Sequence, residues 1–155
     1  MKCLLDASAL LPLVTRCGKR LIVEAHRIDL ITTDLAIYEA CNSLWKLATL
    51  LKTITLEDAA DVTKILKDVT GKNVIQTTDF TKLDLPRTLS IAYKERLTFY
   101  DASYIVTAED AKAILVTEDE KLRKAASKFV KTIAYTRLEN RLIQDAQPKS
   151  PNKQT

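Results

Sequence analysis

The stretch Lys2-Cys3-Leu4-Leu5-Asp6-Ala7-Ser8 decides how the rest of the chain is interpreted. A short apolar run of strand length ends in a carboxylate, and Ser8 follows at a position suited to capping a helix. In α/β proteins the functional site lies beyond the carboxyl ends of the strands, where a strand leads into a helix. Asp is also a common turn residue. The importance of Asp6 therefore depends on whether other acids reach the same place.

The composition favours one helix-rich domain. The chain has 155 residues, 46% of them hydrophobic, with only two Gly and four Pro. These values favour long helices joined by short connections over a sandwich or barrel. No apolar run is long enough to span a membrane, and no signal peptide is recognisable at the start of the sequence.

Cysteine and histidine usage excludes several kinds of site. Cys3, Cys17 and Cys41 lack the C-x-x-C spacing of a zinc site and do not form an even disulfide set, so we expect reduced thiols in a cytoplasmic protein. The single histidine, His26, excludes a histidine-based metal site and argues against a Ser-His-Asp mechanism. The net charge of +4 is compatible with a nucleic-acid partner but does not identify one.

Hydrophobic periodicity predicts strands that alternate with helices. Strands are expected at residues 2–6, 28–33, 73–77, 113–117 and 130–135, and helices at 8–15, 19–26, 35–52, 56–69, 81–96, 99–112 and 118–129. The expected caps of these helices are Ser8, Thr33 or Asp34, Thr55, Thr98 and Thr117. This alternation predicts a three-layer α/β/α fold with a mostly parallel central sheet. We expect one domain over residues 1–143 and a polar, disordered tail over residues 144–155.

Three further carboxylates are expected near helix starts at the same edge of the sheet. Glu39 belongs to a narrow polar stripe on the helix expected at 35–52, which is otherwise apolar and therefore expected to be largely buried. Asp101 stands three residues after Thr98, and Asp119 lies just past the strand expected at 113–117. The alternatives are a solvated face for Glu39 and helix capping or dipole stabilisation for the two aspartates.

Asp6, Glu39, Asp101 and Asp119, the acidic quartet, form a pattern that points to a metal. Like charges gathered within several Å repel and raise one another's pKa, and a hard divalent cation such as Mg²⁺ or Mn²⁺ relieves that repulsion. Such an ion lowers the pKa of water and holds a phosphodiester for in-line attack. The quartet contains no His or Cys, which argues against zinc.

Four segments, taken in order, resemble a PIN domain, and most closely the VapC-type toxin ribonucleases of prokaryotic toxin–antitoxin pairs. The matching segments are Leu4-Leu5-Asp6-Ala7-Ser8, Tyr38-Glu39-Ala40-Cys41-Asn42, Leu97-Thr98-Phe99-Tyr100-Asp101-Ala102-Ser103-Tyr104 and Leu115-Val116-Thr117-Glu118-Asp119-Glu120-Lys121-Leu122. Their order and spacing agree with the family over about residues 2–135. The resemblance implies a parallel sheet flanked by helices, and an acidic quartet that binds Mg²⁺ or Mn²⁺ and cleaves single-stranded RNA.

The resemblance assigns metal binding and catalysis to the acidic quartet and supporting roles to its neighbours. Ser8 and Thr117 match small hydroxyl residues near the first and last acids, and Asn42 is suited to positioning water or phosphate. Glu118 adjoins Asp119 and could share its role, although the spacing of the family favours Asp119.

The resemblance also implies partners. Positive charge must guide RNA to an acidic site, and the candidates are Lys46, Lys121, Arg123 and Lys124, with a solvated helix face as the alternative. Toxins of this type are homodimers, and an antitoxin tail lies across their active-site groove. The apolar excess on the helices of residues 19–67 is a possible source of such an interface, or else belongs to the core.

Three other functions compete with a toxin endoribonuclease. One is a non-catalytic module of the same fold that binds protein or RNA, in which the acids only cap helices. Another is a housekeeping RNA-processing nuclease. The third is a Mg²⁺-dependent phosphatase or phospho-acceptor domain with Asp6 as nucleophile, which would require a second acid where Ser8 stands.

Overall fold

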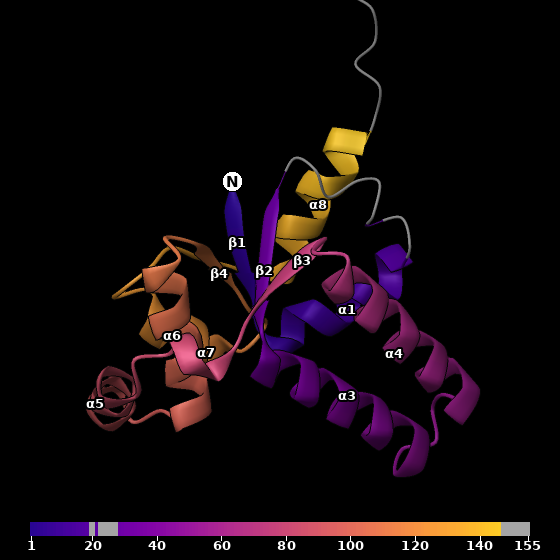
Figure 1. The fold of residues 1–155 in the computed structure, drawn as a ribbon, viewed down its shortest axis with the longest axis horizontal. Coiled ribbons are helices and arrows are strands. Elements are labelled where there is room, and N and C mark those ends of the chain that lie inside the picture. Colours follow the sequence, from indigo (N-terminus) through magenta and orange to yellow (C-terminus); the bar gives the residue numbers. More distant parts are fainter. Residues whose placement is uncertain (19–20, 22–27, 147–155) are drawn as a thin grey trace, which may run out of the picture.

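Five parallel strands form the central sheet of the protein (Figure 1). The computed structural model describes residues 1–18, 21 and 28–146. The strands are β1 (Lys2–Leu5), β2 (Asp29–Thr33), β3 (Ile75–Thr78), β4 (Ile114–Val116) and β5 (Thr132–Ile133), in the order β3-β2-β1-β4-β5. All five lie where the sequence predicts strands.

Helices cover both faces of this sheet. They are α1 (Ala7–Cys17), α3 (Asp34–Thr49), α4 (Leu56–Gly71), the 3-10 turn η3 (Phe80–Lys82), α5 (Leu85–Glu95), α6 (Phe99–Asp110), α7 (Glu120–Ala126) and α8 (Tyr135–Ala146). Figure 1 shows α5 and α6 on one side of the sheet and α1, α3 and α4 on the other. The predicted three-layer α/β/α fold is confirmed.

The central strand β1 defines the point where the chain changes direction across the sheet. After β1 the chain adds β2 and β3 on one side, and it returns to add β4 and β5 on the other. Leu5 pairs with Val116, so the next residues, Asp6 and Thr117, meet across the gap between β1 and β4. Crevices at such a reversal, beyond the carboxyl ends of the strands, are the usual binding sites of open α/β sheets.

Two predicted caps are wrong, because a carboxylate takes the capping position in each case. Asp6, not Ser8, caps α1 by accepting a hydrogen bond from the Ala9 amide. Asp119, not Thr117, caps α7 by accepting one from the Leu122 amide. The hydroxyls of Ser8 and Thr117 are thereby released for contacts between the two strand ends.

Other helix boundaries agree with the sequence except around Pro86. Thr33, Thr55 and Thr98 cap α3, α4 and α6 as predicted. The helix expected at 81–96 with a kink at Pro86 is fully interrupted before Pro86 and divided into η3 and α5. The Asp84 carboxylate accepts from the Arg87 amide and starts a new helix with Pro86 in its first turn.

The helix α3 is less buried than its apolar composition predicts. Only Ala36, Ala40 and Leu44 are buried in it, whereas Trp45 is 51% exposed. Figure 1 shows α3 and α4 extending together beyond the sheet, which explains why much of their apolar surface meets solvent.

The helix α8 was not predicted from the sequence. Its residues Tyr135, Leu138 and Leu142 are buried at helical spacing. Both oxygens of Glu139 accept hydrogen bonds from Arg16 on α1 at 2.8 Å, so α8 is fastened across the end of α1. The helix continues to Ala146, so residues 144–146 of the predicted tail are helical.

Several predictions fall outside the described residues. These are the helix expected at 19–26 apart from Leu21, the single histidine His26, and residues 147–155 of the tail. Among the described helices, none has the length and apolar character that a bilayer crossing requires. The three cysteines are all described and form no disulfide.

The edge of the sheet opposite the crevice carries the start of the chain. The Met1 carbonyl accepts a hydrogen bond from the Asp29 amide at 2.9 Å. This contact extends the pairing of β1 and β2 at their amino ends, and Figure 1 shows the N-terminus at the end of the sheet remote from the starts of α1 and α3.

We predict that α8 is an integral part of the folded domain. Replacing the fully buried Leu138 by Ala should lower the free energy of unfolding by about 2–5 kcal/mol, because a cavity replaces a core side chain. Urea denaturation measures this change. The matched control is Arg137→Ala on the exposed face of α8, which should change stability by less than about 0.5 kcal/mol. Equal stability of the two variants would contradict the docking of α8.

Candidate active site

An open polar pocket lies at the carboxyl edge of the sheet. It has a volume of about 360 Å³ and receives residues from α1, α3, α6 and the segment that follows β4. Its lining consists of Asp6, Ala7, Ser8, Leu11, Pro12, Glu39, Asn42, Ser43, Lys46, Asp101, Tyr104 and Asp119. The structure thus brings together all four members of the acidic quartet from four separate segments, with Ser8, Asn42 and Lys46 beside them.

Asp6 is the most buried acid of the pocket, with 4% of its surface exposed. Its Oδ1 accepts hydrogen bonds from the Ser8 hydroxyl at 2.7 Å and from the Ala9 amide at 3.0 Å. Its Oδ2 accepts one from the Thr117 hydroxyl at 2.5 Å. A carboxylate offers about four lone-pair positions, so one remains on Oδ2, and Asp6 is suited to bind a cation through a single oxygen.

Burial raises the pKa of the Asp6 carboxyl, and the nearby Glu39 carboxylate adds to that increase. The hydrogen bonds from Thr117, Ser8 and the Ala9 amide act in the opposite direction, because they stabilise the ionised form. Burial is the larger effect. The protein therefore maintains a carboxylate at this position against the cost of its desolvation, which is typical of a functional residue.

The hydroxyls of Ser8 and Thr117 connect the two strand ends. Ser8 Oγ accepts from the Glu118 amide at 2.8 Å, and Thr117 Oγ1 accepts from the Asp119 amide at 3.0 Å. The loop after β4 is thus held directly against the start of α1. The Glu118 carboxylate instead accepts from the Tyr135 amide at the start of α8, at 2.6 Å. The pocket is therefore lined by Asp119 and not by its neighbour Glu118.

Glu39 is oriented by a residue that the sequence analysis did not single out. The Tyr104 hydroxyl donates a hydrogen bond to Glu39 Oε2, and both residues line the pocket. Tyr104 is buried, and burial together with the charges of Glu39 and Asp6 raises the pKa of its phenol. The signal in the sequence is its position three residues after Asp101, which places both side chains on one face of α6.

Asp101 and Asp119 both line the pocket from helix starts, Asp101 in the first turn of α6 and Asp119 as the cap of α7. The Asp119 carboxylate accepts from the Leu122 amide at 2.9 Å and is exposed. The Asp101 amide donates to Thr98 Oγ1, whereas its partly buried carboxylate has no hydrogen-bond partner in the part of the chain that the structure describes. The Asp101 carboxylate is therefore available to a ligand.

The donor set of the pocket fits a hard cation that retains water. Its acids supply only oxygen ligands, as Mg²⁺ and Mn²⁺ prefer. Within residues 1–18, 21 and 28–146, no three Asp, Glu, His or Cys side chains converge closely enough to surround an ion by themselves. Mg²⁺ does not require this, because it keeps several waters and is usually bound through one or two carboxylates.

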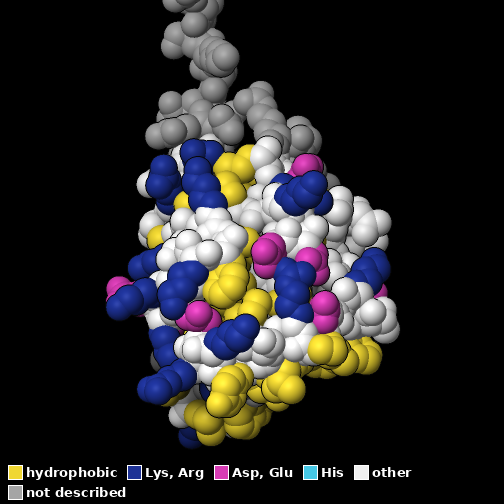
Figure 2. Space-filling view, turned by 90° about the vertical axis from the view of Figure 1, so that its left-hand side faces the viewer, with side chains coloured by type: hydrophobic (Ala, Val, Ile, Leu, Met, Phe, Trp, Pro, Cys, Tyr) yellow, Lys and Arg dark blue, Asp and Glu magenta, His cyan; other side chains and the backbone are white. Residues whose placement is uncertain are grey.

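The predicted cationic residues divide into two groups. Lys46 lines the pocket, while Lys121, Arg123 and Lys124 on α7 are not part of its lining. Arg123 lies 3.9 Å from Glu120, a weak surface ion pair. Figure 2 shows Lys and Arg spread over the side of the molecule that carries α5 and α6, with hydrophobic side chains gathered along its lower edge.

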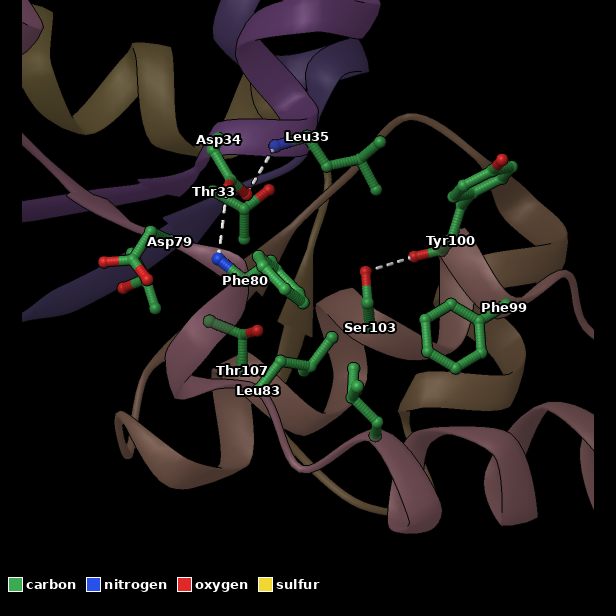
Figure 3. Close-up of a pocket in the computed structure, with 12 residues that line it drawn as sticks. Thr33, Asp34, Leu35, Asp79, Phe80, Leu83, Phe99, Tyr100, Ser103 and Thr107 are labelled. Carbon is green, nitrogen blue, oxygen red and sulfur yellow. Dashed lines mark hydrogen bonds between the residues drawn. The ribbon is translucent and has the colours of Figure 1, made fainter.

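A second, apolar pocket lies next to the acidic one (Figure 3). The apolar side chains Leu83, Leu85, Phe80 and Phe99 dominate its lining. Asp34, at its rim, accepts hydrogen bonds from the Leu35 and Phe80 amides and is therefore committed to the backbone. The first turn of α6 contributes to both pockets, since Tyr100 lines the apolar pocket and Asp101 the acidic one.

A parallel α/β sheet with four acids at its carboxyl edge defines the class of protein to which this chain belongs. The model of the PIN domain matches residues 3–128. The chain belongs to the PIN domain family.

Two similar proteins come from Pyrobaculum aerophilum. The chain is 39% identical over 119 residues to exonuclease VapC9 of Pyrobaculum aerophilum, covering 77% of this chain and 81% of the relative. It is 32% identical over 140 residues to ribonuclease VapC3 of the same organism, covering 83% of this chain and 95% of the relative.

Solved structures share the fold. The crystal structure of PAE2754 from Pyrobaculum aerophilum has a TM-score of 0.67 and 30% identity, covering 93% of this chain and 99% of that one. The structure of VapBC-1 from nontypeable Haemophilus influenzae has a TM-score of 0.58 and 12% identity, covering 88% of this chain and 99% of that one. At 12% identity, this second likeness concerns the fold alone.

We predict that Asp6→Asn stabilises the protein at neutral pH. An acid whose pKa is raised by folding contributes stability below its unfolded pKa, and that contribution is lost as the pH rises through the folded pKa. The uncharged Asn avoids this loss and can still cap α1. In EDTA, urea denaturation should therefore show Asp6→Asn more stable than wild type at pH 7, with the difference shrinking toward pH 4.

The matched control for this prediction is Asp101→Asn, because the Asp101 carboxylate is partly exposed and makes no hydrogen bond to the described residues. Its stability at pH 7 should be close to that of wild type, because no hydrogen bond of the carboxylate to the described residues is lost. A loss of stability in Asp6→Asn at pH 7 would show that hydrogen bonding outweighs burial at Asp6.

Proposed function

We propose that this chain is a metal-dependent endoribonuclease and the toxin of a toxin–antitoxin pair, with single-stranded RNA as its substrate. The observation that carries the proposal is the gathering of Asp6, Glu39, Asp101 and Asp119 around one pocket in a PIN domain. The names of the two relatives, an exonuclease and a ribonuclease, support nuclease activity.

The proposed cofactor is Mg²⁺ or Mn²⁺. Asp6, through the remaining position on Oδ2, and Asp101, with its unpaired carboxylate, would be the principal ligands. Glu39 and Asp119 would complete the site directly or through water. When bound, the cation supplies Lewis acidity, which lowers the pKa of water and neutralises charge on a phosphodiester.

The side chains of the pocket would hold and orient the RNA around that centre. Lys46 offers a positive charge to the phosphate backbone, and the Asn42 amide, one helical turn from Glu39, can donate a hydrogen bond to a phosphate oxygen. Hydrolysis by in-line attack would leave 5′-phosphate and 3′-hydroxyl ends. Ser8 and Thr117 would keep Asp6 in place throughout.

The contacts of the acids favour an enzyme over a non-catalytic module. Helix capping accounts for Asp6 and Asp119. It does not account for Glu39, which bonds to Tyr104, or for the carboxylate of Asp101, which has no partner among the described residues. A housekeeping RNA-processing nuclease would use the same site and differs from a toxin only in its target and its partner.

The proposed partners are a second copy of the chain and an antitoxin protein. Apolar side chains are exposed on α3, on α4 and in the segment between them, as the sequence suggests for an interface. Others are exposed on α5, which the sequence analysis did not include. The exposed residues are Tyr38, Trp45, Leu50, Leu51, Leu56, Leu85, Leu89 and Tyr93. Large apolar surface of this kind is typical of protein–protein contacts. An antitoxin is proposed from the resemblance to VapC proteins.

A circular single-stranded RNA tests the proposed activity. An endonuclease opens a circle, whereas an exonuclease requires a free end. With Mg²⁺ the wild-type protein should linearise the circle, and EDTA should abolish cleavage. Asp101→Asn should lower the rate at least about 100-fold while leaving the circular dichroism spectrum unchanged, because a residue that touches the reacting centre is lost without a change in packing. Cleavage of linear RNA only would indicate an exonuclease, and full activity of Asp101→Asn or in EDTA would refute the metal–carboxylate mechanism.

We predict that Lys46 contributes to RNA affinity through charge alone. Lys46→Ala should weaken binding to all single-stranded sequences about equally and reduce the slope of log affinity against log salt by about one. Fluorescence anisotropy over a series of salt concentrations measures both quantities. Lys121→Ala, outside the pocket, is the control; an equal loss in both variants would indicate general surface charge instead of a site.

A further inference from the structure

We infer that Tyr104 is a positioning residue that acts through Glu39, fixing this carboxylate in the pocket for the cation. The inference rests on the proposed function, because it assigns the role of one residue within that site. Tyr104 comes from α6 and is 2% exposed, and its hydroxyl donates to Glu39 Oε2 on α3. The contact joins residues 65 positions apart in the chain.

Glu39 needs such a contact to hold one orientation. It is partly exposed on α3, and a glutamate side chain has several rotatable bonds whose freedom is lost when it is fixed. The hydrogen bond from Tyr104 engages Oε2 and leaves Oε1 without a protein partner among the described residues. One oxygen thus anchors the side chain, and the other remains for a cation or for water.

The side chains that donate hydrogen bonds to Asp6 and Glu39 are alike in chemistry. Neutral hydroxyls hold Asp6, and a neutral phenol holds Glu39. Among the described residues no Lys or Arg forms an ion pair with any member of the acidic quartet, although such pairs occur elsewhere, as between Arg87 and Asp110. A neutral O–H orients a carboxylate without cancelling its charge, so the pocket keeps its full attraction for a cation.

The position of Tyr104 on α6 couples two acids. Asp101 and Tyr104 are three residues apart and face the same pocket. Any displacement of α6 therefore moves Asp101 itself and, through the phenol, the anchor of Glu39. The helix α6 therefore positions Asp101 directly and Glu39 through the hydroxyl of Tyr104.

A pair of phenylalanine variants tests this role on the full chain. Tyr104→Phe keeps the ring and removes the hydroxyl. The matched control is Tyr135→Phe: Tyr135 is 3% exposed, and its hydroxyl donates to Glu139 at 3.1 Å, outside the pocket. Each variant loses one tyrosine–glutamate hydrogen bond, so both should lose similar stability in thermal melts.

The two variants should differ in metal binding. Titration calorimetry with Mn²⁺ alone should show affinity reduced about 10- to 100-fold in Tyr104→Phe, the usual effect of losing a contact that orients a ligand, and unchanged in Tyr135→Phe. In RNA cleavage, Tyr104→Phe should lower kcat and leave KM for RNA unchanged. A wild-type Mn²⁺ affinity in Tyr104→Phe would overturn the inference.

The Glu39→Ala background separates positioning from a general structural effect. If Tyr104 acts through Glu39, adding Tyr104→Phe to Glu39→Ala should reduce Mn²⁺ affinity no further. A further reduction as large as in the wild-type background would overturn the inference. Absence of both Mn²⁺ binding and RNA cleavage in the wild-type protein would instead refute the proposed function, and the role of Tyr104 with it.

Discussion

The hydrogen bond from Thr117 to Asp6 is the contact on which the acidic edge depends. It joins the ends of the two strands between which the chain reverses direction, and it places a hydroxyl against a buried charge. The Thr117 hydroxyl also accepts a hydrogen bond from the Asp119 amide, and the Ser8 hydroxyl accepts one from the Glu118 amide. The same short contacts therefore fix the positions of both Asp6 and Asp119. Their geometry follows from the parallel pairing of Leu5 with Val116.

The elements that sequence reasoning predicts are those with a local signal. The strands are short apolar runs bounded by polar residues, and all five are found. The caps of α1 and α7 are predicted wrongly because a hydroxyl and a carboxylate stand close together at each helix start. Capping propensity alone does not decide between Ser8 and Asp6, or between Thr117 and Asp119. The sequence does not predict α8 although Tyr135, Leu138 and Leu142 have helical spacing, because Tyr135 also fits the end of the strand expected at 130–135. Burial of α3 is overestimated because periodicity does not show where a helix extends past the sheet.

The site shows the same division between local and long-range information. The sequence predicts the four acids because each follows a strand or lies near the start of a helix. The parallel topology then brings them to the carboxyl edge of the sheet. The partner of Glu39 is not found this way, since Tyr104 lies in a distant helix and has the appearance of a core aromatic. Likewise, the solvent-exposed row on α5 is visible only once Leu85, Leu89 and Tyr93 are placed on the outer face of a helix that covers α6.

The bond between Met1 and Asp29 has a practical consequence for handling the protein. It holds the first residue at the edge of the sheet opposite the acidic crevice. A carrier protein, a biotin or a solid support joined ahead of Met1 would therefore lie at the amino ends of the strands, and the acidic pocket would face away from it. Long nucleic acids could then reach an immobilised sample without hindrance from the attachment.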